Sequence, residues 1–507
     1  MRAANSHFGK HYINGVWTTP KGAMIDVENP ATREIFARVP DGTPEEVDAA
    51  VAAAQSAFPR WCSTPLAQRI ALMEGMLRRF CEKTEDVIEL EVAELGAPVA
   101  FARSKHCLYQ QKRTAAFIAA ARSIAAEEAF PASLVMREPV GVVAAITPWN
   151  YPLGQIIQKV VPALLMGCTV VLKPSEWTPL TAVLLIEAFE EAGFPPGVLN
   201  LVQGYGETVG EAMTGHAGVD LISFTGSTAV GRRIAGRAAP MMKRLILELG
   251  GKSPVFVDRT ANLDVAARRI AWGRFINAGQ TCVAPDYVLA TSDVIEPLAG
   301  KIAEAVTRFF GSDPQHSDSF GRIINARHFD RLTALLPDPK SPATGRTVCG
   351  GNTRRDDLYI APTVLLGVKP DAPVMQEEIF GPILPILEVA DAKAAVEFIN
   401  ARPRPLAAYA FTGSKRVRRM FEREVSCGAP GFNLPLGHLI SSWLPFGGVG
   451  ASGMGSYHGK AGFLEFSHVK TVVGKPAVPD TLSLVYPPYD GLKKILISAV
   501  SHTPRVR

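Results

Sequence analysis

The chain has 507 residues, of which 47% are hydrophobic and 20% are charged, and it carries a net charge of +5. This composition excludes a disordered chain and is typical of a globular protein with two or three domains. The small net charge gives no argument for a nucleic-acid partner, and none is expected. Seven widely spaced cysteines without a Cys-x-x-Cys pair favour a reducing compartment over disulfides or a metal site.

The sequence predicts a cytoplasmic protein. The N-terminal residues lack the apolar core of a secretory signal, and no apolar run reaches the about 20 residues that span a bilayer. The C-terminal stretch 491–500 has a short apolar core between polar residues. A helix docked on a partner subunit explains this stretch better than membrane association, which is not expected.

The N-terminal third is predicted to combine short strands with a set of helices. Residues 11–40 have strand character, and Asn14-Gly15 is a hairpin signal between two of the strands. From Thr43 to about Ala121 the pattern is helical, and Thr43 followed by Pro44 is typical of a helix start. Residues 130–141 are expected to form an extended arm.

Short apolar strands then alternate with amphipathic helices. The alternation begins at about residue 141, and 244–257 is expected to close the series. Such alternation predicts a parallel, doubly wound sheet, which binds ligands at the carboxyl ends of its strands. A second α/β series is expected over 263–445, followed by a strand near 466–473, a proline-rich link and the tail.

Cys282 is a candidate nucleophile because it follows a Gly279-Gln280 turn and precedes an apolar run. Backbone N–H groups at such a bend favour the reactive thiolate, and they also suit an oxyanion formed on an attacked carbonyl. Most free cysteines are inert core residues, so this pattern alone leaves both interpretations open.

Two further side chains follow predicted strands. Asn150 is either an oxyanion donor or an ordinary turn residue before Pro152. Glu248 ends an apolar strand, where burial raises a carboxyl pKa into the range of a general base. The alternative is a glutamate held by Lys252 or by a helix end.

Three more segments suit a dinucleotide. Lys173 and Glu176 could bind a ribose from both sides, and the acidic residue favours NAD over NADP. The glycine turn 224–231 could meet a pyrophosphate with its N–H groups. Glu378 and Phe380 could offer a carboxylate to a second ribose and a wall to a nicotinamide ring. The alternative for Lys173 and Glu176 is a solvated charged loop. For 224–231 it is an ordinary glycine at a strand end, and for Glu378 and Phe380 it is a capped turn.

Together these motifs resemble the aldehyde dehydrogenase superfamily. The resemblance runs from about Tyr12 to Val473 and is carried in order by TPWNYP, KPSE, FTGSTAVG, ELGGK, GQTC, EEIFGP and PFGGVGASGMG. It implies an α/β protein with a Rossmann-like, doubly wound cofactor domain (1–122 and 140–249), an α/β catalytic domain (250–469), and a small β-arm with a C-terminal tail (123–139 and 470–507) that joins subunits into a homodimer or homotetramer.

The resemblance also implies roles for individual residues. Cys282 would be the nucleophile, Glu248 the base, and Asn150 with the Cys282 N–H the oxyanion site, for oxidation of an uncharged aliphatic or aromatic aldehyde through a thioester. The cofactor is expected to be NAD, with NADP as the alternative, bound by Thr147, Trp149, Lys173, Ser175, Glu176, Gly206, Phe224, Gly226, Ser227, Leu249, Glu378 and Phe380. The substrate tunnel would include Tyr151, Gln155, Gln158, Ile276 and His438.

The motifs mix two branches of the family. Lys159 is similar to a lysine of the small-aldehyde branch, whereas the segments after Cys282 resemble the class-three fatty and aromatic aldehyde branch. Tyr457-His458 stands where the small-aldehyde branch has a glutamate, and Leu434 stands where the class-three pattern commonly has an aspartate. A semialdehyde dehydrogenase, a coenzyme-A-acylating enzyme and an inactive structural relative are the alternatives, and the presence of Glu248 favours hydrolysis.

Overall fold

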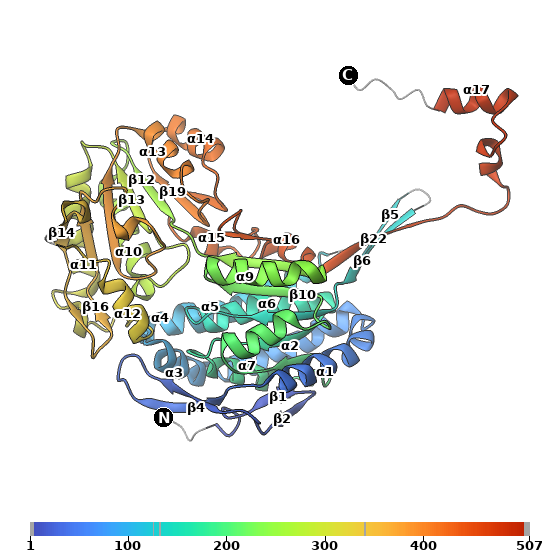
Figure 1. The fold of residues 1–507 in the computed structure, drawn as a ribbon, viewed down its shortest axis with the longest axis horizontal. Coiled ribbons are helices and arrows are strands. Elements are labelled where there is room, and N and C mark those ends of the chain that lie inside the picture. The colour runs from blue at the N-terminus through green and yellow to red at the C-terminus, as the bar shows by residue number, and fades with distance from the viewer. Residues whose placement is uncertain (1–4, 125, 131–132, 339–340, 501–507) are drawn as a thin grey trace. The chain divides into compact units, whose positions relative to one another are not determined.

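The computed structural model describes residues 5–124, 126–130, 133–338 and 341–500 (Figure 1). The chain forms two compact units, which are described separately. Unit 1 comprises Met1–Ile124 and Pro139–His468, and unit 2 comprises Ala125–Glu138 and Val469–Arg507. Unit 1 contains two large sheets, and both are built mainly from parallel strands.

The first sheet has eight strands in the order β2-β1-β9-β8-β7-β10-β11-β21. Its strands are β1 (His11–Ile13), β2 (Val16–Thr18), β7 (Val142–Ile146), β8 (Thr169–Lys173), β9 (Leu199–Leu201), β10 (Leu221–Gly226), β11 (Arg244–Leu249) and β21 (Gly453–Met454). The chain runs outward from β7 to β9 and then returns to β10 beside β7, so the order reverses between these two strands. This topological switch point confirms the predicted Rossmann-like, doubly wound sheet.

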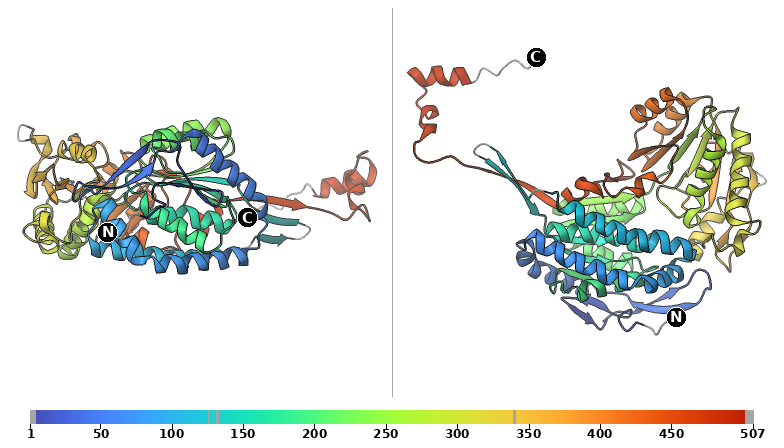
Figure 2. Two further views of the ribbon diagram at one scale, coloured as in Figure 1. Left: turned by 90° about the horizontal axis from the view of Figure 1, so that it is seen from below. Right: turned by 180° about the vertical axis from the view of Figure 1, so that it is seen from behind.

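Helices cover both faces of this sheet because alternate strand residues point in opposite directions (Figure 2). Val143 and Ala145 pack in one core with helices α2 (Leu66–Glu82), α3 (Thr84–Leu95), α5 (Tyr109–Ala121), α6 (Pro152–Met166) and α7 (Leu180–Glu191). Val142 and Ala144 pack in the opposite core with α1 (Pro44–Cys62), α8 (Glu211–Gly215) and α9 (Thr228–Ala238).

The predicted helix start at Thr43 and Pro44 is confirmed, because Thr43 is the N-cap of α1. The Thr43 side chain accepts from the Glu46 N–H, and the Glu46 carboxylate accepts from the Thr43 N–H at 2.9 Å. This capping box satisfies two backbone donors that the first turn of a helix would otherwise leave unpaired.

The second sheet has seven strands in the order β14-β17-β18-β13-β12-β19-β20, and β14 is its antiparallel edge strand. The strands are β12 (Pro254–Val257), β13 (Tyr287–Ala290), β14 (Arg346–Cys349), β17 (Thr363–Leu366), β18 (Ile383–Glu388), β19 (Ala407–Phe411) and β20 (Ala429–Phe432). Its core includes residues of α10 (Leu263–Phe275), α11 (Ile295–Phe310), α13 (Ala392–Asn400) and α14 (Lys415–Glu424).

One boundary differs from the sequence prediction. The stretch 244–257 does not close a single series, because β11 pairs with β10 in the first sheet whereas β12 pairs with β13 and β19 in the second. Gly250 and Gly251 interrupt the apolar pattern between the two strands. The chain therefore passes from one sheet to the other directly after Glu248 and Leu249.

Smaller elements complete unit 1. They are β3 (Met24–Glu28), β4 (Ile35–Pro40), α4 (Val99–Phe101), the π-helices η1 (Ala102–Leu108) and η2 (Gly206–Gly210), the 3₁₀ helices η3 (Ala239–Met241), η4 (Ile276–Gly279), η5 (Pro314–His316), η6 (Pro342–Thr344) and η7 (Pro373–Met375), α12 (Ala326–Thr333), the short strands β15 (Thr353–Arg354) and β16 (Tyr359–Ile360), α15 (Gly437–Ile440) and α16 (Gly459–Leu464). Of these, η1, η4 and α15 contribute residues near Cys282.

Unit 2 is built around a three-stranded sheet in the order β22-β6-β5. It consists of β5 (Glu127–Phe130), β6 (Ser133–Pro139) and β22 (Ser467–Val473), followed by η8 (Thr481–Val485) and α17 (Gly491–Val500). Within the residues that the structure describes, we find no helix with the length and apolar character needed to cross a membrane.

Candidate functional site

The loop that carries Cys282 is a tight bend between α10 and β13. Asn277 and Ala278 have left-handed backbone angles (φ 53° and 51°), and Gly279 follows with φ 77°. A side chain at Gly279 would collide with the carbonyl oxygen of Gly381, so only glycine fits this close approach. The bend places Cys282 at the start of the next turn, where it is half-buried.

Gln280 fixes this loop with its side-chain amide. Its Nε2 donates to the carbonyl oxygens of Asn277 (3.1 Å) and Arg322 (3.0 Å), and its Oε1 accepts from the Ile324 N–H (3.0 Å). The amide is 1% exposed and saturated by these contacts. A glutamine immediately before Thr281-Cys282 therefore acts as a rigid support for the loop.

Asn150 is joined to the same loop. Its Nδ2 donates to the carbonyl oxygen of Gln280 at 3.1 Å, while its own backbone carbonyl accepts from Asn277 Nδ2 at 3.0 Å. An amide nitrogen has two N–H donors, so a second one remains available beside Cys282. This geometry is compatible with an oxyanion donor, and Asn150 is buried at a bend before Pro152.

The ionisation of Cys282 differs from the expectation that its surroundings favour the thiolate. Burial is the main factor that raises the pKa of this thiol, and the nearby carboxyls of Glu378 and Glu248 raise it further. The N–H groups of Cys282 and Val283 oppose this shift without overcoming it. The raised pKa favours the thiol over the thiolate at Cys282.

Glu248 is a buried carboxyl at the carboxyl end of β11, where it pairs in register with Thr225 of β10. Within the described part of the chain, no side chain donates to this carboxyl, and a backbone contact with Gly448 favours its charged form. Burial raises its pKa to about 8, and the charge of Lys159 acts in the opposite direction. The interpretation that Lys252 holds Glu248 is wrong, because Lys252 Nζ binds Asp286 at 2.6 Å.

Lys159 is fully buried beside Glu248 and contacts two hydroxyl groups. Its Nζ donates to Thr225 Oγ1 and to Tyr457 OH, each at 2.6 Å, and Ser223 Oγ lies 2.7 Å from the same Tyr457 oxygen. Burial lowers the pKa of Lys159 to about 7. The amine of Lys159 is therefore hydrogen-bonded to the neutral phenol of Tyr457.

A cavity of about 1100 Å³ opens in front of these groups. Asn150, Glu248 and Cys282 all line it, together with Trp149, Gln155, Gly226, Ser227, Leu249, Glu378 and Phe380 from the sequence prediction. The N-terminus of α9 also faces it through Ser227, which caps that helix by accepting from the Val230 N–H. The N-terminus of a helix as long as α9 is suited to bind a pyrophosphate.

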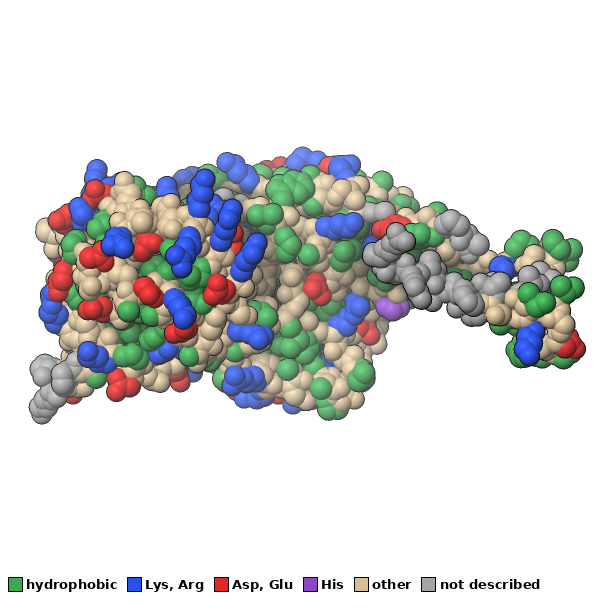
Figure 3. Space-filling view, turned by 90° about the horizontal axis from the view of Figure 1, so that it is seen from above, with side chains coloured by type: hydrophobic (Ala, Val, Ile, Leu, Met, Phe, Trp, Pro, Cys, Tyr) green, Lys and Arg blue, Asp and Glu red, His purple; other side chains and the backbone are tan. Residues whose placement is uncertain are grey.

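Arginines add positive charge around the cavity. Arg232 of α9 lines it, as do Arg327 and Arg331 of α12 and Arg402 and Arg404 after α13. Figure 3 shows Lys and Arg side chains gathered near the middle of unit 1 as seen from above. The sequence analysis did not single these arginines out, because they are scattered along the chain and meet only in the fold. Positive charge here suits an anionic cofactor.

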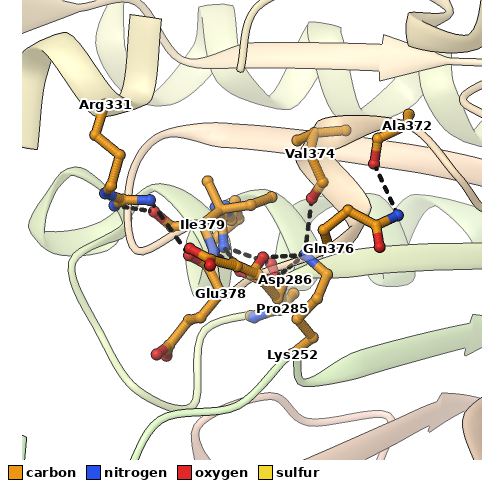
Figure 4. A network of polar contacts seen from close by, with 11 residues as sticks. Lys252, Pro285, Asp286, Arg331, Ala372, Val374, Gln376, Glu378 and Ile379 are labelled. Carbon is orange, nitrogen blue, oxygen red and sulfur yellow. Dashed lines mark hydrogen bonds and ion pairs between the residues drawn. The ribbon is translucent and has the colours of Figure 1, made fainter. Parts of the chain in front are cut away.

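Glu378 lies in a polar network that organises the opposite wall (Figure 4). Asp286 is its centre: it binds Lys252, accepts from Arg274 Nη1 at 3.0 Å and accepts from the Ile379 N–H at 3.1 Å. Burial and the charge of Asp286 raise the pKa of Glu378 to about 8. The network fixes the backbone around Glu378, while its carboxyl lies against Gly250 and Gly251 and lines the cavity.

The same wall contains two aromatic rings and a glycine. Phe380 meets the edge of Trp149 at a ring distance of 5.4 Å and an angle of 87°. A side chain at Gly250 would collide with the Glu378 carboxyl, so this carboxyl lies directly against the chain that leaves β11. The two rings and the carboxyl form a slot of the kind that a ribose and a nicotinamide ring require.

The remaining predicted cofactor residues lie outside the lining of this cavity. Lys173 ends β8, and its Nζ lies 3.1 Å from Glu176 Oε2; Thr147 donates its N–H to the Lys173 carbonyl. Ser175 is buried between them. The ring of Phe224 lies against Gly226, and Gly206 begins η2. Phe224 lies near the carboxyl end of β10, and the other residues lie at or after the ends of β7, β8 and β9, so all share the carboxyl edge of the first sheet.

Only some of the predicted substrate residues line the cavity. Gln155 and Gln158 line the cavity, whereas Tyr151, Ile276 and His438 do not. Tyr151 OH lies 2.9 Å from Thr281 Oγ1, next to the nucleophile, and its ring stacks on His106 of η1. His438 packs against Tyr409, whose OH donates to the Val283 carbonyl at 2.7 Å. Both tyrosines therefore support the loop of Cys282.

Sequence reasoning missed His106 and Tyr409 as parts of this support. His106 is buried, and its Nδ1 lies 2.9 Å from Oε2 of buried Glu91. A histidine within a helical stretch is the available signal, yet it does not reveal the distant partner. Among the described residues, no cluster of histidine, cysteine, aspartate or glutamate could hold a metal ion.

A doubly wound sheet that faces a cavity with a cysteine, an amide and a buried carboxyl defines a dinucleotide-dependent oxidoreductase as a class. The family model described as aldehyde dehydrogenase family matches residues 17–472. This chain belongs to that family. It is an oxidoreductase that converts an aldehyde to the carboxylic acid with a nicotinamide dinucleotide as its cofactor.

Individual relatives agree with this placement. The chain is 38% identical to 3-succinoylsemialdehyde-pyridine dehydrogenase of a Pseudomonas species, over 92% of this chain and 98% of the relative. It is 44% identical to human aldehyde dehydrogenase family 3 member B1, over 70% and 74% of the two chains. The crystal structure of a mutant of aldehyde dehydrogenase C from Pseudomonas syringae, complexed with NAD+ and octanal, is 34% identical and superimposes with a TM-score of 0.88, covering 93% of this chain and 98% of the other.

Proposed function

We propose that this chain oxidises an uncharged aliphatic or aromatic aldehyde with Cys282 as the nucleophile, Asn150 as an oxyanion donor and Glu248 as the general base. The observation that carries the proposal is that these three side chains line one cavity. Their types match the three needs of the reaction, which are a soft nucleophile, a fixed donor and a carboxyl with a raised pKa.

The chemistry follows from these positions. Cys282, once deprotonated, adds to the aldehyde carbon, and the oxygen is stabilised by Asn150 Nδ2 and the Cys282 N–H. A nicotinamide dinucleotide held in this cavity would supply the acceptor for the hydride that leaves this carbon. The thiohemiacetal thereby becomes a thioester. Glu248 removes a proton from water, the water attacks the thioester, and the acid and the free thiol are released.

The cofactor is proposed to lie along the carboxyl edge of the first sheet. Lys173, Ser175, Glu176 and Gly206 would bind its adenosine half, and the N-terminus of α9 with Ser227 would bind the pyrophosphate. Glu378, Phe380, Trp149 and Leu249 would hold the nicotinamide half. Residues 1–122 with 140–249 form the cofactor domain in this proposal, and 250–469 form the catalytic domain.

A panel of aldehydes with both cofactors tests this proposal. We expect uncharged aldehydes to be oxidised with NAD in preference to NADP, because the Glu176 carboxylate repels a 2′-phosphate. Glu176→Gln removes this charge and is expected to narrow the preference about tenfold, since one such contact near the surface is worth about 1 kcal/mol or more. A preference that is unchanged in the variant contradicts the role of Glu176. Strong preference for an acidic semialdehyde contradicts the proposed substrate class.

The pH dependence of turnover tests the coupling between Lys159 and Glu248. Turnover of the wild type is expected to rise as the pH passes about 8, because the base must be ionised and its pKa is about 8. Lys159 lowers that pKa through its positive charge. The pKa of Lys159 is about 7, so only a minor fraction of the amine is charged where Glu248 titrates. Lys159→Met therefore should move the rising limb of kcat to higher pH by a fraction of a pH unit.

The measurement is kcat at saturating cofactor between roughly pH 6 and pH 10, a range that brackets the base. Tyr457→Phe is the matched variant: it keeps the amine and removes one hydrogen-bond acceptor, so a smaller shift in the same direction is expected. A rising limb that stays in place in Lys159→Met would show that the amine does not control Glu248.

A semialdehyde substrate is the second candidate function. It is favoured by the Pseudomonas relative, which is named as a semialdehyde dehydrogenase and is matched over nearly its whole length. Coenzyme A as the acyl acceptor has no comparable support, and a dependence of turnover on coenzyme A would be needed to introduce it.

The assembly and the location complete the proposal. Unit 2 carries exposed apolar side chains on β22 and in its tail, among them Val473, Tyr489 and Leu492. We infer that β5, β6, β22 and the tail join subunits into a homodimer or homotetramer. The seven free cysteines support a cytoplasmic location, where thiols stay reduced.

A further inference from the structure

Two glutamine side chains face the cavity from the first half of α6. Gln155 and Gln158 are three residues apart, so they lie on the same face of the helix. Both are buried, with exposed fractions of 9% and 3%, and both line the cavity that Cys282 also lines. The reaction described above uses neither amide. Buried amides are normally hydrogen-bonded, so two of them at the cavity of Cys282 indicate a polar partner that the reaction itself does not supply.

Gln158 is oriented by His458. The Nε2 atom of His458 is hydrogen-bonded to Gln158 Oε1, and the imidazole stacks on Phe446 at a ring distance of 5.6 Å. Burial lowers the pKa of His458 well below its usual value, so the ring is neutral. In the tautomer that carries its N–H at Nε2, the ring donates to the amide oxygen. The amide nitrogen of Gln158 then remains as a donor for the cavity.

Gln155 offers the complementary group. Within the described residues, its Oε1 is buried and has no hydrogen-bond partner. A buried amide oxygen without a partner is unfavourable, and a polar atom of a ligand would relieve it. The two amides together can therefore donate to and accept from a single oxygen atom. Neither carries a charge, so they do not select a carboxylate.

We propose that Gln155 and Gln158 bind an uncharged oxygen, a hydroxyl or a carbonyl, on the tail of the aldehyde substrate. This inference rests on the proposed function and names its substrate class more closely. The amides select among aldehydes, while Cys282, Asn150 and Glu248 carry out the chemistry. A site built to hydrogen-bond a substrate oxygen rejects an analogue that lacks it, because the amides are then left unpaired.

The test compares substrates of equal shape. The 3- and 4-hydroxybenzaldehydes are paired with the corresponding methylbenzaldehydes, and kcat/KM is measured for each with NAD. The wild type is expected to prefer at least one hydroxy compound over its methyl partner by about tenfold, the size of one neutral hydrogen bond. Gln155→Met and Gln158→Met keep the side-chain length and remove the amide, so each should reduce this ratio.

The comparison of variants removes the intrinsic difference in reactivity between hydroxy and methyl aldehydes, because that difference is the same for every variant. Gln111→Met is the control: this glutamine of α5 donates to Thr84 away from the cavity, and its variant should keep the wild-type ratio. A wild type with no such preference, or a preference that survives both cavity variants, overturns the inference. Absence of NAD reduction with every aldehyde would instead overturn the proposed function.

Discussion

Replacing Cys282 with alanine is expected to abolish NAD reduction by the purified protein. The sulfur forms the bond to the aldehyde carbon in the proposed reaction, and among the cavity-lining residues it is the one cysteine. Without that bond no thiohemiacetal forms, and loss of a nucleophile of this kind lowers turnover by about 10⁵-fold. The measurement is the absorbance of the reduced cofactor at saturating aldehyde.

A control separates this loss from a loss of folding. Cys62→Ala changes a half-buried cysteine at the end of α1, far in sequence from the loop, and is expected to keep wild-type turnover. Cofactor binding, followed by quenching of tryptophan fluorescence, should persist in Cys282→Ala because Trp149 and the α9 N-terminus are unchanged. Continued aldehyde-dependent NAD reduction by the pure Cys282→Ala protein would remove Cys282 from the mechanism.

Replacing Glu248 with glutamine is expected to lower steady-state turnover by about 10²- to 10⁴-fold, the usual contribution of a general base. Glutamine keeps the shape of the side chain, and among the described residues Glu248 has no side-chain hydrogen bond that the change would remove. The proposed role lies after thioester formation. The variant should therefore release a first equivalent of reduced cofactor per site quickly and then turn over slowly.

Stopped-flow absorbance distinguishes the steps. A burst followed by a slow phase is the expected record, and Glu248→Asp, which retains a carboxylate one methylene shorter, should recover part of the slow rate. A variant without any burst would place Glu248 before the thioester, as the group that deprotonates Cys282. A normal steady-state rate in Glu248→Gln would mean that another base activates the water.

The position of Glu248 also illustrates how far sequence reasoning reaches. An apolar run that ends in Glu-Leu-Gly-Gly predicts a carboxyl at a strand end, and β11 confirms that placement. Whether the carboxyl is paired with a cation could not be predicted, because Arg244 and Lys252 both lie four positions away in the sequence. In the fold, Lys252 binds Asp286, which lies 34 residues further along the chain. Ion pairs between distant residues depend on the packing of both sheets.

The nucleophile loop shows the same division. Gly279-Gln280-Thr281-Cys282 predicts a bend and a candidate nucleophile, since local turn chemistry is written in adjacent residues. The raised pKa of the thiol was not predicted, because it results from burial and from two carboxyls on other elements. The supports from Tyr151 and Tyr409 likewise come from residues more than a hundred positions away.

The sequence by itself determined the alternating α/β pattern, the ordered motifs and the residue types available for the chemistry, because periodicity and turn signals are local. Only the tertiary structure decided which of these groups meet. It places Lys159 against Tyr457, frees Glu248 from Lys252 and aims Gln155 and Gln158 into the cavity of Cys282. The reason is physical: burial and the distance between charges set the pKa values and the unpaired amides, and both depend on the packed chain.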